Sequence, residues 1–486
     1  MKTNAEKLPS PWVSAIPLAV LTGLLYVVIR AFGGEAINGG SQIALLSATS
    51  VCVMLSIGIY RCRWAVLEEA IIDNIRASAS AIVILLLIGA IAGTWMISGV
   101  VPTMIYYGLQ ILHPSFFLVA SCAICAVVSL MTGSSWTTIA TIGVALMGIG
   151  QAMGFSEGWV AGAIISGAYF GDKLSLLSDT TVLASSTAGV EVFTHIRYML
   201  YTTVPSMLIA LGVFTVAGLA LDHGVSTHAE MYAATLAATF RITPWLLAVP
   251  LATGMLIARK LPAIVTLFCA AVFACIAMLL AQPELVAKVA GVGGLDFMSG
   301  FKGVLMSCFG PTAIPTGSPQ LDELVATRGM AGMLNTVWLI ICAMCFGGVM
   351  TGSGMLGALT SVFLRFVRRA FSAVASTVGA GIFFNLCTAD QYISIILSGR
   401  LFRELYAERG LEPRLLSRSV EDSATVCSVL VPWNSCGMTQ ATVLGVSTFV
   451  YMPYCIFNIV SPLMSLMVAA IGWKIKRAAG TAAHPH

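Results

Sequence analysis

The run AGAIISGAYFGDKLSLLSDTTVLASS, residues 161–186, places Asp172, Lys173 and Asp179 inside an otherwise uncharged stretch. Charged side chains at membrane depth are costly, so they usually line an ion or substrate path. Glycine, serine and threonine also crowd this run, which favours a broken helix that offers hydroxyl and carbonyl oxygens. Transporters build cation sites from interrupted transmembrane helices of this kind. The run therefore predicts a membrane carrier.

The composition supports a membrane location. Of the 486 residues, 58% are hydrophobic and 9% are charged, whereas a soluble domain is about 25% charged. We predict an all-α polytopic protein of a bacterial inner membrane, with both termini in the cytoplasm. The net charge of +4 is what cytoplasmic Lys and Arg loops produce, and it gives no indication of nucleic-acid binding.

Hydropathy divides the chain into membrane elements, since a spanning helix needs about 20 apolar residues. The clear spans are 12–31, 42–60, 79–97, 198–218, 243–258, 262–281, 330–352 and 450–472. Two longer segments, 160–192 and 422–448, are interrupted. Two more, 115–150 and 371–401, are predicted re-entrant hairpins with polar tips. The expected total is ten crossings plus two hairpins. The Gly/Pro-rich segment 282–325 is expected to be an outside connection, with a further broken span as the alternative.

An internal repeat runs through the chain at a nearly constant separation. Ser98-Gly99 recurs as Ser353-Gly354, and Thr132 recurs as Thr388. The pattern Gly-Val-x-x-Phe-x4-Tyr that begins at Gly189 begins again at Gly445. Several matches at one spacing indicate a duplication.

Basic residues predict that the two units have opposite orientations in the membrane. Arg61 and Arg63 precede the first unit, and its later loops at 108–114 and 150–158 contain no Lys or Arg. The matching loops of the second unit are basic, with Arg365, Arg368, Arg369, Arg400, Arg403, Arg409, Arg414 and Arg418. This pattern is typical of inverted repeats.

The resulting domain prediction has five parts. They are N-terminal helices at 1–63, the first repeat at 64–220, connecting helices and a loop at 221–320, the second repeat at 321–473, and a cytoplasmic tail at 474–486.

The first candidate site surrounds the predicted break in 160–192. Hard oxygen ligands suit Na⁺, and a carboxylate can alternatively bind H⁺. The expected ion or substrate ligands are Asp172, Ser175, Ser178, Asp179, Thr180 and Thr181, with Na⁺ held by Asp172 and Asp179. Tyr169 and Lys173 are supporting residues, and Lys173 is expected to pair with a buried acid or to reach water. The alternative is plain helix capping by Ser178 and Asp179.

The second candidate site lies in SRSVEDSATVCSVLVPWNSCG, residues 417–437. Pro432 removes a backbone donor and frees a carbonyl, which predicts a break. Asp422, Thr425 and Asn434 are predicted ligands, and Glu421 and Trp433 are predicted supporting residues. The alternative is a solvated helix start, because Ser419 to Asp422 also matches a capping box.

The two hairpin tips should reach the same depth from opposite faces. Asp390 is the sole charged residue between Arg369 and Arg400 and is a predicted ligand. Supporting residues at the tips are Ser134, Ser135, Trp136, Thr137, Asn385, Thr388 and Tyr392. Aromatic residues such as Trp136 and Tyr392 are more often packing groups than ligands.

Four blocks of this sequence resemble the NhaC-type Na⁺/H⁺ antiporter family of the ion-transporter superfamily. They are TGSSWTTIATIGVALMGIG, GAYFGDKLSLLSDTT, TADQYISIILSGRLF and LSRSVEDSATVCSVLVPWNSCG, the last followed by LGVSTFVYMPYCIFN. The resemblance implies an inverted-repeat carrier with re-entrant hairpins and an elevator motion. It also implies Na⁺/H⁺ exchange, coupled in some members to malate and lactate. The chain departs from the family pattern at Thr138, Leu176, Val182 and Val429.

The leading functional hypothesis is therefore Na⁺/H⁺ exchange by alternating access through Asp172 or Asp179. The rival is a Na⁺- or H⁺-coupled carrier of an organic carboxylate or amino acid. An intramembrane protease and a passive channel are weaker alternatives. We expect no cofactor beyond transported or coupling Na⁺ and H⁺. Expected partners are membrane lipid, small ions, an organic acid or amino acid, and a second copy in a homodimer.

Overall fold

A computed structural model describes residues 9–32, 38–221, 226–259, 261–294, 296–317, 321–322, 325–365, 367 and 369–475. Arg368 and most of the predicted tail, 476–486, lie outside the described residues. The described residues are helical, and their one β-type pairing is an isolated bridge between Thr312 and Thr327. The all-α prediction is confirmed.

Eight helices in the described part of the chain are long and apolar enough to cross a membrane. They are α1 (Pro11–Phe32), α2 (Gly40–Gly58), α3 (Trp64–Ile97), α5 (Pro114–Thr132), α10 (Val192–Ala220), α13 (Ala263–Ala281), α19 (Ala370–Thr388) and the segment Met330–Gly352. This last segment consists of η4 (Met330–Met333) followed by α17 (Leu334–Gly352). Two bent pairs raise the number to ten: Glu230–Thr239 with Pro244–Ala258 at 95°, and Thr448–Tyr454 with Ile456–Ile471 at 54°. The protein is a multi-pass membrane protein, as predicted.

The remaining short helices differ from the prediction in places. Segment 282–325 contains α14 (Pro283–Ala290) and α15 (Phe297–Phe309), and its described residues include no helix of spanning length. Two short helices after the Ser-Gly pairs, α4 (Val100–Ile111) and α18 (Met355–Arg365), were not predicted. Predicted span 243–258 begins with η3 (Pro244–Leu247) before α12 (Ala248–Ala258), and α11 (Ser226–Thr239) precedes it.

Both predicted hairpins consist of two helical arms joined by a short turn. In the first, α5 is followed by α6 (Ser135–Thr138), the π-helix η2 (Ile139–Gly143) and α7 (Val144–Ala152). In the second, α19 is followed by α20 (Gln391–Glu408). The arm α20 includes Arg400 and Arg403, which are exposed within a helix and not in a loop.

Both predicted interruptions are present. The first separates α8 (Glu157–Leu174) from α9 (Asp179–Ala188). The second follows α21 (Pro413–Val420), the π-helix η5 (Glu421–Thr425) and η6 (Ser428–Leu430), and it ends at α22 (Ser435–Leu444). The chain then continues through α23 (Thr448–Tyr451), η7 (Met452–Tyr454) and α24 (Ile456–Ile471).

The glycines before the first break pack helices together and do not unwind α8. Gly167 and Gly171 lie within continuous helix. A Cβ at Gly167 would lie 2.0 Å from the Cys122 carbonyl oxygen, and one at Gly171 would lie 2.2 Å from the Ala126 carbonyl oxygen, both on α5. Glycine in this run was expected to help break the helix, and this was wrong for Gly171, which lies within α8 and allows this close approach.

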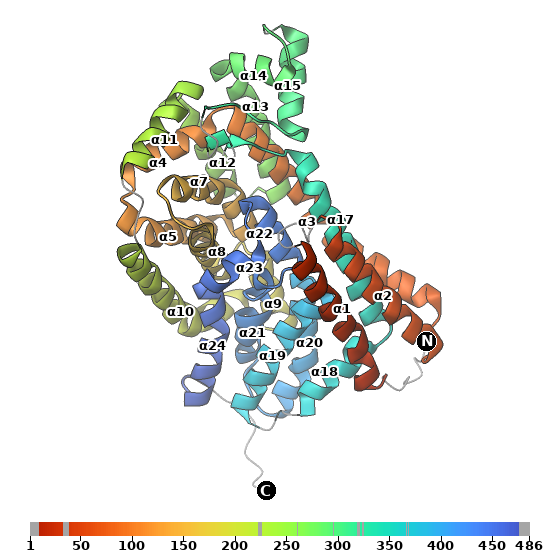
Figure 1. Cartoon of the computed structure of the whole chain (residues 1–486). Coiled ribbons are helices and arrows are strands. Elements are labelled where there is room, and N and C mark those ends of the chain that lie inside the picture. Colours follow the sequence, from red (N-terminus) through yellow and green to blue (C-terminus); the bar gives the residue numbers. More distant parts are fainter. Residues whose placement is uncertain are drawn as a thin grey trace.

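The helices form two packed regions that share a centre (Figure 1). On one side, α1 and α2 lie beside α17 and α18, and α17 also packs along α3. On the other side, α5 packs against α8 and α10, and α10 packs against α24. The arms α19 and α20 lie between these regions, where α19 packs against α17 and α18 on one side and against α24 on the other (Figure 1).

Candidate functional site

The first break places a buried carboxylate at a hairpin tip. Asp172 lies in the last turn of α8 and is 8% exposed. Its Oδ2 atom accepts hydrogen bonds from the backbone N of Ser135 at 3.0 Å and from Ser135 Oγ at 2.7 Å. Two donors from one residue thus hold one carboxylate oxygen against the start of α6.

The hydroxyls at the break also satisfy the helix ends. Ser178 caps α9 by accepting from the backbone N of Thr181 at 3.4 Å. Thr181 Oγ1 donates at 3.0 Å to the carbonyl oxygen of Lys173, which the break leaves without a helical partner. Ser175 Oγ accepts from the backbone N of Leu177 at 3.2 Å. The capping interpretation of these residues is therefore confirmed for Ser178.

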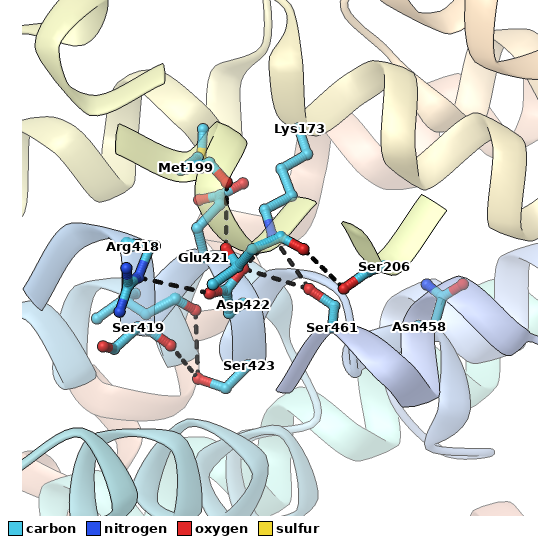
Figure 2. Close-up of polar contacts among 12 residues, drawn as sticks. Lys173, Met199, Ser206, Arg418, Ser419, Glu421, Asp422, Ser423, Asn458 and Ser461 are labelled. Carbon is cyan, nitrogen blue, oxygen red and sulfur yellow. Dashed lines mark hydrogen bonds and ion pairs between the residues drawn. The ribbon is translucent and has the colours of Figure 1, made fainter. Parts of the chain in front are cut away.

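A buried ion pair connects the two broken segments (Figure 2). The Lys173 ammonium contacts Asp422 Oδ1, and both side chains are 0% exposed. Lys173 Nζ also lies 3.1 Å from Ser461 Oγ on α24. Asp422 Oδ1 accepts further hydrogen bonds from Thr202 Oγ1 at 3.1 Å and from Ser461 Oγ at 3.2 Å. Of the two predicted positions for Lys173, the structure gives the pairing with a buried acid.

Arg418 approaches the same acid from the other side (Figure 2). Its Nε lies 3.9 Å from Asp422 Oδ2, and its guanidinium carbon lies 4.7 Å from the centre of the Tyr198 ring. The side chain is 0% exposed. Placing Arg418 in a basic cytoplasmic loop was wrong, because its position four residues before Asp422 puts both on one helical face.

Glu421 is adjacent to Asp422 in the sequence but has fewer hydrogen-bond partners. It is 0% exposed. Its Oε1 lies 3.5 Å from Thr180 Oγ1, and its Oε2 has no hydrogen-bond partner among the described residues. Thr425, a predicted ligand on the same π-helix, is buried, and its hydroxyl likewise has no partner among them. The solvated helix start considered for Glu421 and Asp422 was wrong, because both side chains lie inside the protein.

The second hairpin tip carries its own buried carboxylate. Asp390 is 2% exposed and caps α20 by accepting from the backbone N of Ile393 at 3.0 Å. Its Oδ2 lies 3.3 Å from Ser435 Oγ, at the start of α22, and 3.5 Å from Ser78 Oγ, on α3. Asp390 therefore joins the tip to the second break and to α3.

Amide side chains hold the second break to the hairpin. Asn434 Nδ2 donates at 3.2 Å to the carbonyl oxygen of Asn385, and its Oδ1 caps α22. Asn385 Nδ2 donates at 2.8 Å to the carbonyl oxygen of Ala424. Trp433 Nε1 donates at 2.9 Å to the carbonyl oxygen of Leu386. Here Asn434 and Trp433 bind protein groups and support the backbone around the break.

The tips themselves share one hydroxyl pattern. Thr132 Oγ1 lies 3.2 Å from both the Ser134 carbonyl oxygen and Thr138 Oγ1. Thr388 Oγ1 lies 3.1 Å from both the Asp390 carbonyl oxygen and Ser394 Oγ. Among the other supporting residues, Thr137 donates from its backbone N to Ser134 Oγ at 3.2 Å. Tyr169 is buried, and Trp136 and Tyr392 are half-buried.

Asp179 borders the site but is not buried in it. It is the first residue of α9, and its side chain is exposed. The capping turn that buries Ser178 and Thr180 directs the residue between them outward. Asp172 is thus the buried carboxylate of the first break. Joint ligation of Na⁺ by Asp172 and Asp179 stays a prediction.

Four residues of this arrangement were missed by sequence reasoning: Ser78, Thr202, Arg418 and Ser461. Arg418 had a usable signal, its i,i+4 spacing to Asp422. The three hydroxyls had none, because single Ser and Thr residues inside apolar helices are common and usually bond their own backbone.

Comparisons with known proteins agree with the resemblance. The sequence profile described as the Na⁺/H⁺ antiporter family matches residues 167–473. The Na(+)/H(+) antiporter NhaC of Alkalihalophilus pseudofirmus is 34% identical over 87% of this chain and 89% of the relative. The malate-2H(+)/Na(+)-lactate antiporter of Bacillus subtilis is 35% identical over 89% of each chain. The arginine/ornithine antiporter ArcD of Halobacterium salinarum is 32% identical over 97% of this chain and 94% of the relative.

Proposed function

This chain belongs to the Na⁺/H⁺ antiporter family, and from that premise we propose that it exchanges Na⁺ for H⁺ by alternating access, with Asp172 as the cation-binding carboxylate. The observation that carries this proposal is the position of Asp172 at a helix break, buried, with Ser135 holding one of its two oxygens. A carboxylate, hydroxyls and freed carbonyls are the ligands that hard cations prefer. Competition between Na⁺ and H⁺ for the Asp172 carboxylate is the simplest way to couple Na⁺ transport to H⁺ transport.

Alternating access requires parts that move against one another, and the tip geometry supports a duplication, whose inverted orientation is predicted from the basic loops. Gly133 and Ala389 both have left-handed φ values, +67° and +56°, and each precedes a capping residue, Ser134 or Asp390. Gly189 and Gly445 end the half-helices α9 and α22 with φ values of +75° and +70°. We place the repeats at 64–220 and 321–473, with an elevator motion and cytoplasmic termini as parts of the same proposal.

The test is ion flux in proteoliposomes. Asp172→Asn removes the charge and keeps the shape, so it should abolish ²²Na⁺ uptake driven by a pH gradient. The matched control is Asp73→Asn, which neutralises an exposed acid on α3 and should leave the flux unchanged. Wild-type flux in a folded Asp172→Asn carrier would remove this residue from the mechanism.

A second candidate function is exchange of an organic acid or amino acid. Two buried cations, Lys173 and Arg418, share the one carboxylate of Asp422, and cationic side chains are common partners of substrate carboxylates. Relatives of this chain are named for malate/lactate and arginine/ornithine exchange. Fluxes that occur only when such a solute is present on the opposite side would favour this function over simple Na⁺/H⁺ exchange.

A further inference from the structure

A cavity of about 570 Å³ shares no lining residue with the candidate site at the two helix breaks. Its walls come from α4, the end of α11, α14 and the chain after α15. In Figure 1 these helices lie at the end of the molecule away from the C-terminus. The aromatic, amide and charged residues that line the cavity are Tyr106, Tyr107, Arg241, Gln282, Glu284 and Lys288. The proposed ion exchange gives this cavity no role.

A buried glutamine fixes the shape of the cavity. Gln282 is 2% exposed. Its Nε2 donates to the carbonyl oxygen of Arg241 at 3.2 Å, and its Oε1 accepts from the backbone N of Arg241 at 3.2 Å. A Cβ at Gly99, just before α4, would lie 2.5 Å from the same Nε2. Gln282 therefore holds the backbone at Arg241 and the start of α4 together, so the cavity is a built part of the fold.

The charges around the cavity favour an anion. Arg241 Nη2 lies 2.6 Å from Glu284 Oε1. Lys288, one turn further along α14, has no ion-pair partner among the described residues. The lining thus carries one net positive charge, and Tyr106 and Tyr107 add phenol groups to it. An ammonium, a guanidinium and phenols are donors that phosphate oxygens accept from.

The helix α13 leads from a lipid-facing surface to this cavity. It ends at Ala281, and the next residue is Gln282. Every fourth residue from 268 to 280 is a large exposed hydrophobic side chain, so these side chains share one face of α13. At about 1.5 Å per residue, this face is ~18 Å long, close to the ~15 Å of hydrocarbon in one leaflet. Its residues are Phe268, Val272, Ile276 and Leu280.

Trp245 indicates that the cavity lies at the depth of the lipid headgroups. It lies in η3, close after Arg241 in the sequence, and it is 47% exposed. Tryptophan is enriched where a membrane protein crosses from hydrocarbon to water. Because Gln282 holds Arg241 at the end of α13, the cavity lies where the apolar face of α13 ends.

We propose that this cavity binds the headgroup of an anionic phospholipid, whose phosphate contacts Lys288 and Arg241 and whose acyl chain lies along the exposed face of α13. This site is separate from ion exchange and does not depend on it. A soluble phosphate compound carries the same chemical group but has no apolar part to cover that face. Glu284 favours a phosphodiester with one negative charge over a phosphate monoester with nearly two, because its carboxylate repels the second charge.

Native mass spectrometry of the purified full chain tests the inference. The chain in detergent is mixed with equal amounts of phosphatidylglycerol and phosphatidylcholine that carry the same acyl chains, so the two lipids differ in headgroup charge. The wild type should retain phosphatidylglycerol with a preference of about fivefold or more, and the double variant Arg241→Gln with Lys288→Gln should lower the preference below about twofold.

Two controls keep the outcome interpretable. Lys302→Gln makes the same change at an exposed lysine of α15 that donates to the Ala290 carbonyl oxygen at 2.8 Å and does not line the cavity. It should keep the wild-type preference. Inorganic phosphate in excess over the lipid should leave the phosphatidylglycerol bound. If the double variant does not fold, Lys288→Gln alone takes its place and should lower the preference at least about twofold.

Four results would overturn the headgroup site. They are equal retention of the two lipids by the wild type, an unchanged preference in the folded Arg241 and Lys288 variant, an equal loss of preference in Lys302→Gln, and displacement of phosphatidylglycerol by inorganic phosphate. The third would show that surface charge in general attracts the lipid, and the fourth that the cavity takes soluble phosphate.

Discussion

The two hairpin tips have nearly the same local geometry but place their carboxylates on opposite partners. In the first, the tip supplies a serine, Ser135, and the broken helix supplies the acid, Asp172. In the second, the tip supplies the acid, Asp390, and the broken segment supplies the serine, Ser435. The same backbone arrangement can therefore hold a carboxylate either on the hairpin tip or on the broken helix that the tip contacts.

The surroundings of the two acids differ as well. Asp390 uses one oxygen to cap its own helix and the other to contact two serines. Asp172 caps no helix, and Ser135 engages one of its oxygens. Asp390 therefore holds the tip in place, whereas Asp172 is the carboxylate that we propose as the cation ligand.

The largest expected effect is the difference in Na⁺ flux between the Asp-to-Asn substitutions at Asp172 and at Asp390. Asp172→Asn should reduce Na⁺ flux more than about 100-fold, because it removes the proposed ligand charge. Asp390→Asn should reduce it less than about tenfold, because asparagine is as good an N-cap as aspartate. Proteoliposome uptake of ²²Na⁺ measures both, and equal losses would mean that the two tips have equivalent roles.

Breaking the ion pair between Lys173 at the first break and Asp422 at the second should have a large effect on stability. Lys173→Met leaves Asp422 without its ammonium partner, so it should destabilise the carrier by about 3 kcal/mol, as for other broken buried pairs. Denaturation in detergent, followed by tryptophan fluorescence, measures the change.

Two comparisons give this measurement a control. Arg76→Met breaks an exposed pair with Asp73 and should cost less than about 1 kcal/mol. The double variant Lys173→Met with Asp422→Leu also removes the carboxylate that the buried Arg418 faces, so it should be less stable than Lys173→Met alone. Equal stabilities of the single and double variants would argue against the contact between Asp422 and Arg418.

Alanine substitutions of Ser135 and Ser435 should differ in their effect on Na⁺ affinity, and this difference is smaller than the preceding effects. Ser135→Ala removes a 2.7 Å hydrogen bond to a charged group, so it should weaken Na⁺ affinity by about 1.5–3 kcal/mol, or roughly 10- to 100-fold. Ser435→Ala removes a 3.3 Å contact to Asp390 and should change affinity less than about threefold. The Na⁺ concentration for half-maximal flux is the readout, and a larger effect at Ser435 would reverse the proposed assignment of the tips.

The smallest effect concerns the turn residues. Ala389 has a φ of +56°, a conformation that strains an L-residue, whereas Gly133 occupies the matching position of the first tip. Ala389→Gly should therefore stabilise the carrier by up to about 1 kcal/mol. Gly133→Ala should destabilise it, since its Cβ would lie 2.5 Å from Leu177 Cβ. Thermal melting should show a higher melting temperature for Ala389→Gly and a lower one for Gly133→Ala than for the wild type.

Much of the fold followed from local patterns in the sequence. Hydropathy located most of the long helices, and proline and serine marked the two breaks within a few residues. Thr132 and Thr388 marked the tips correctly, because each hydroxyl binds groups no more than six residues away. Short apolar helices such as α4 and α18 escaped prediction, since their length is below that of a span.

The partners of the buried charges depended on the tertiary structure. Sequence alone established a polytopic carrier whose rare charges lie at interrupted helices, because apolar length and local capping are properties of short segments. The structure decided that Lys173 meets Asp422, that Arg418 is buried and that Asp179 is exposed. Lys173 and Asp422 are 249 residues apart, and contacts at that separation arise from helix packing, which no local pattern encodes.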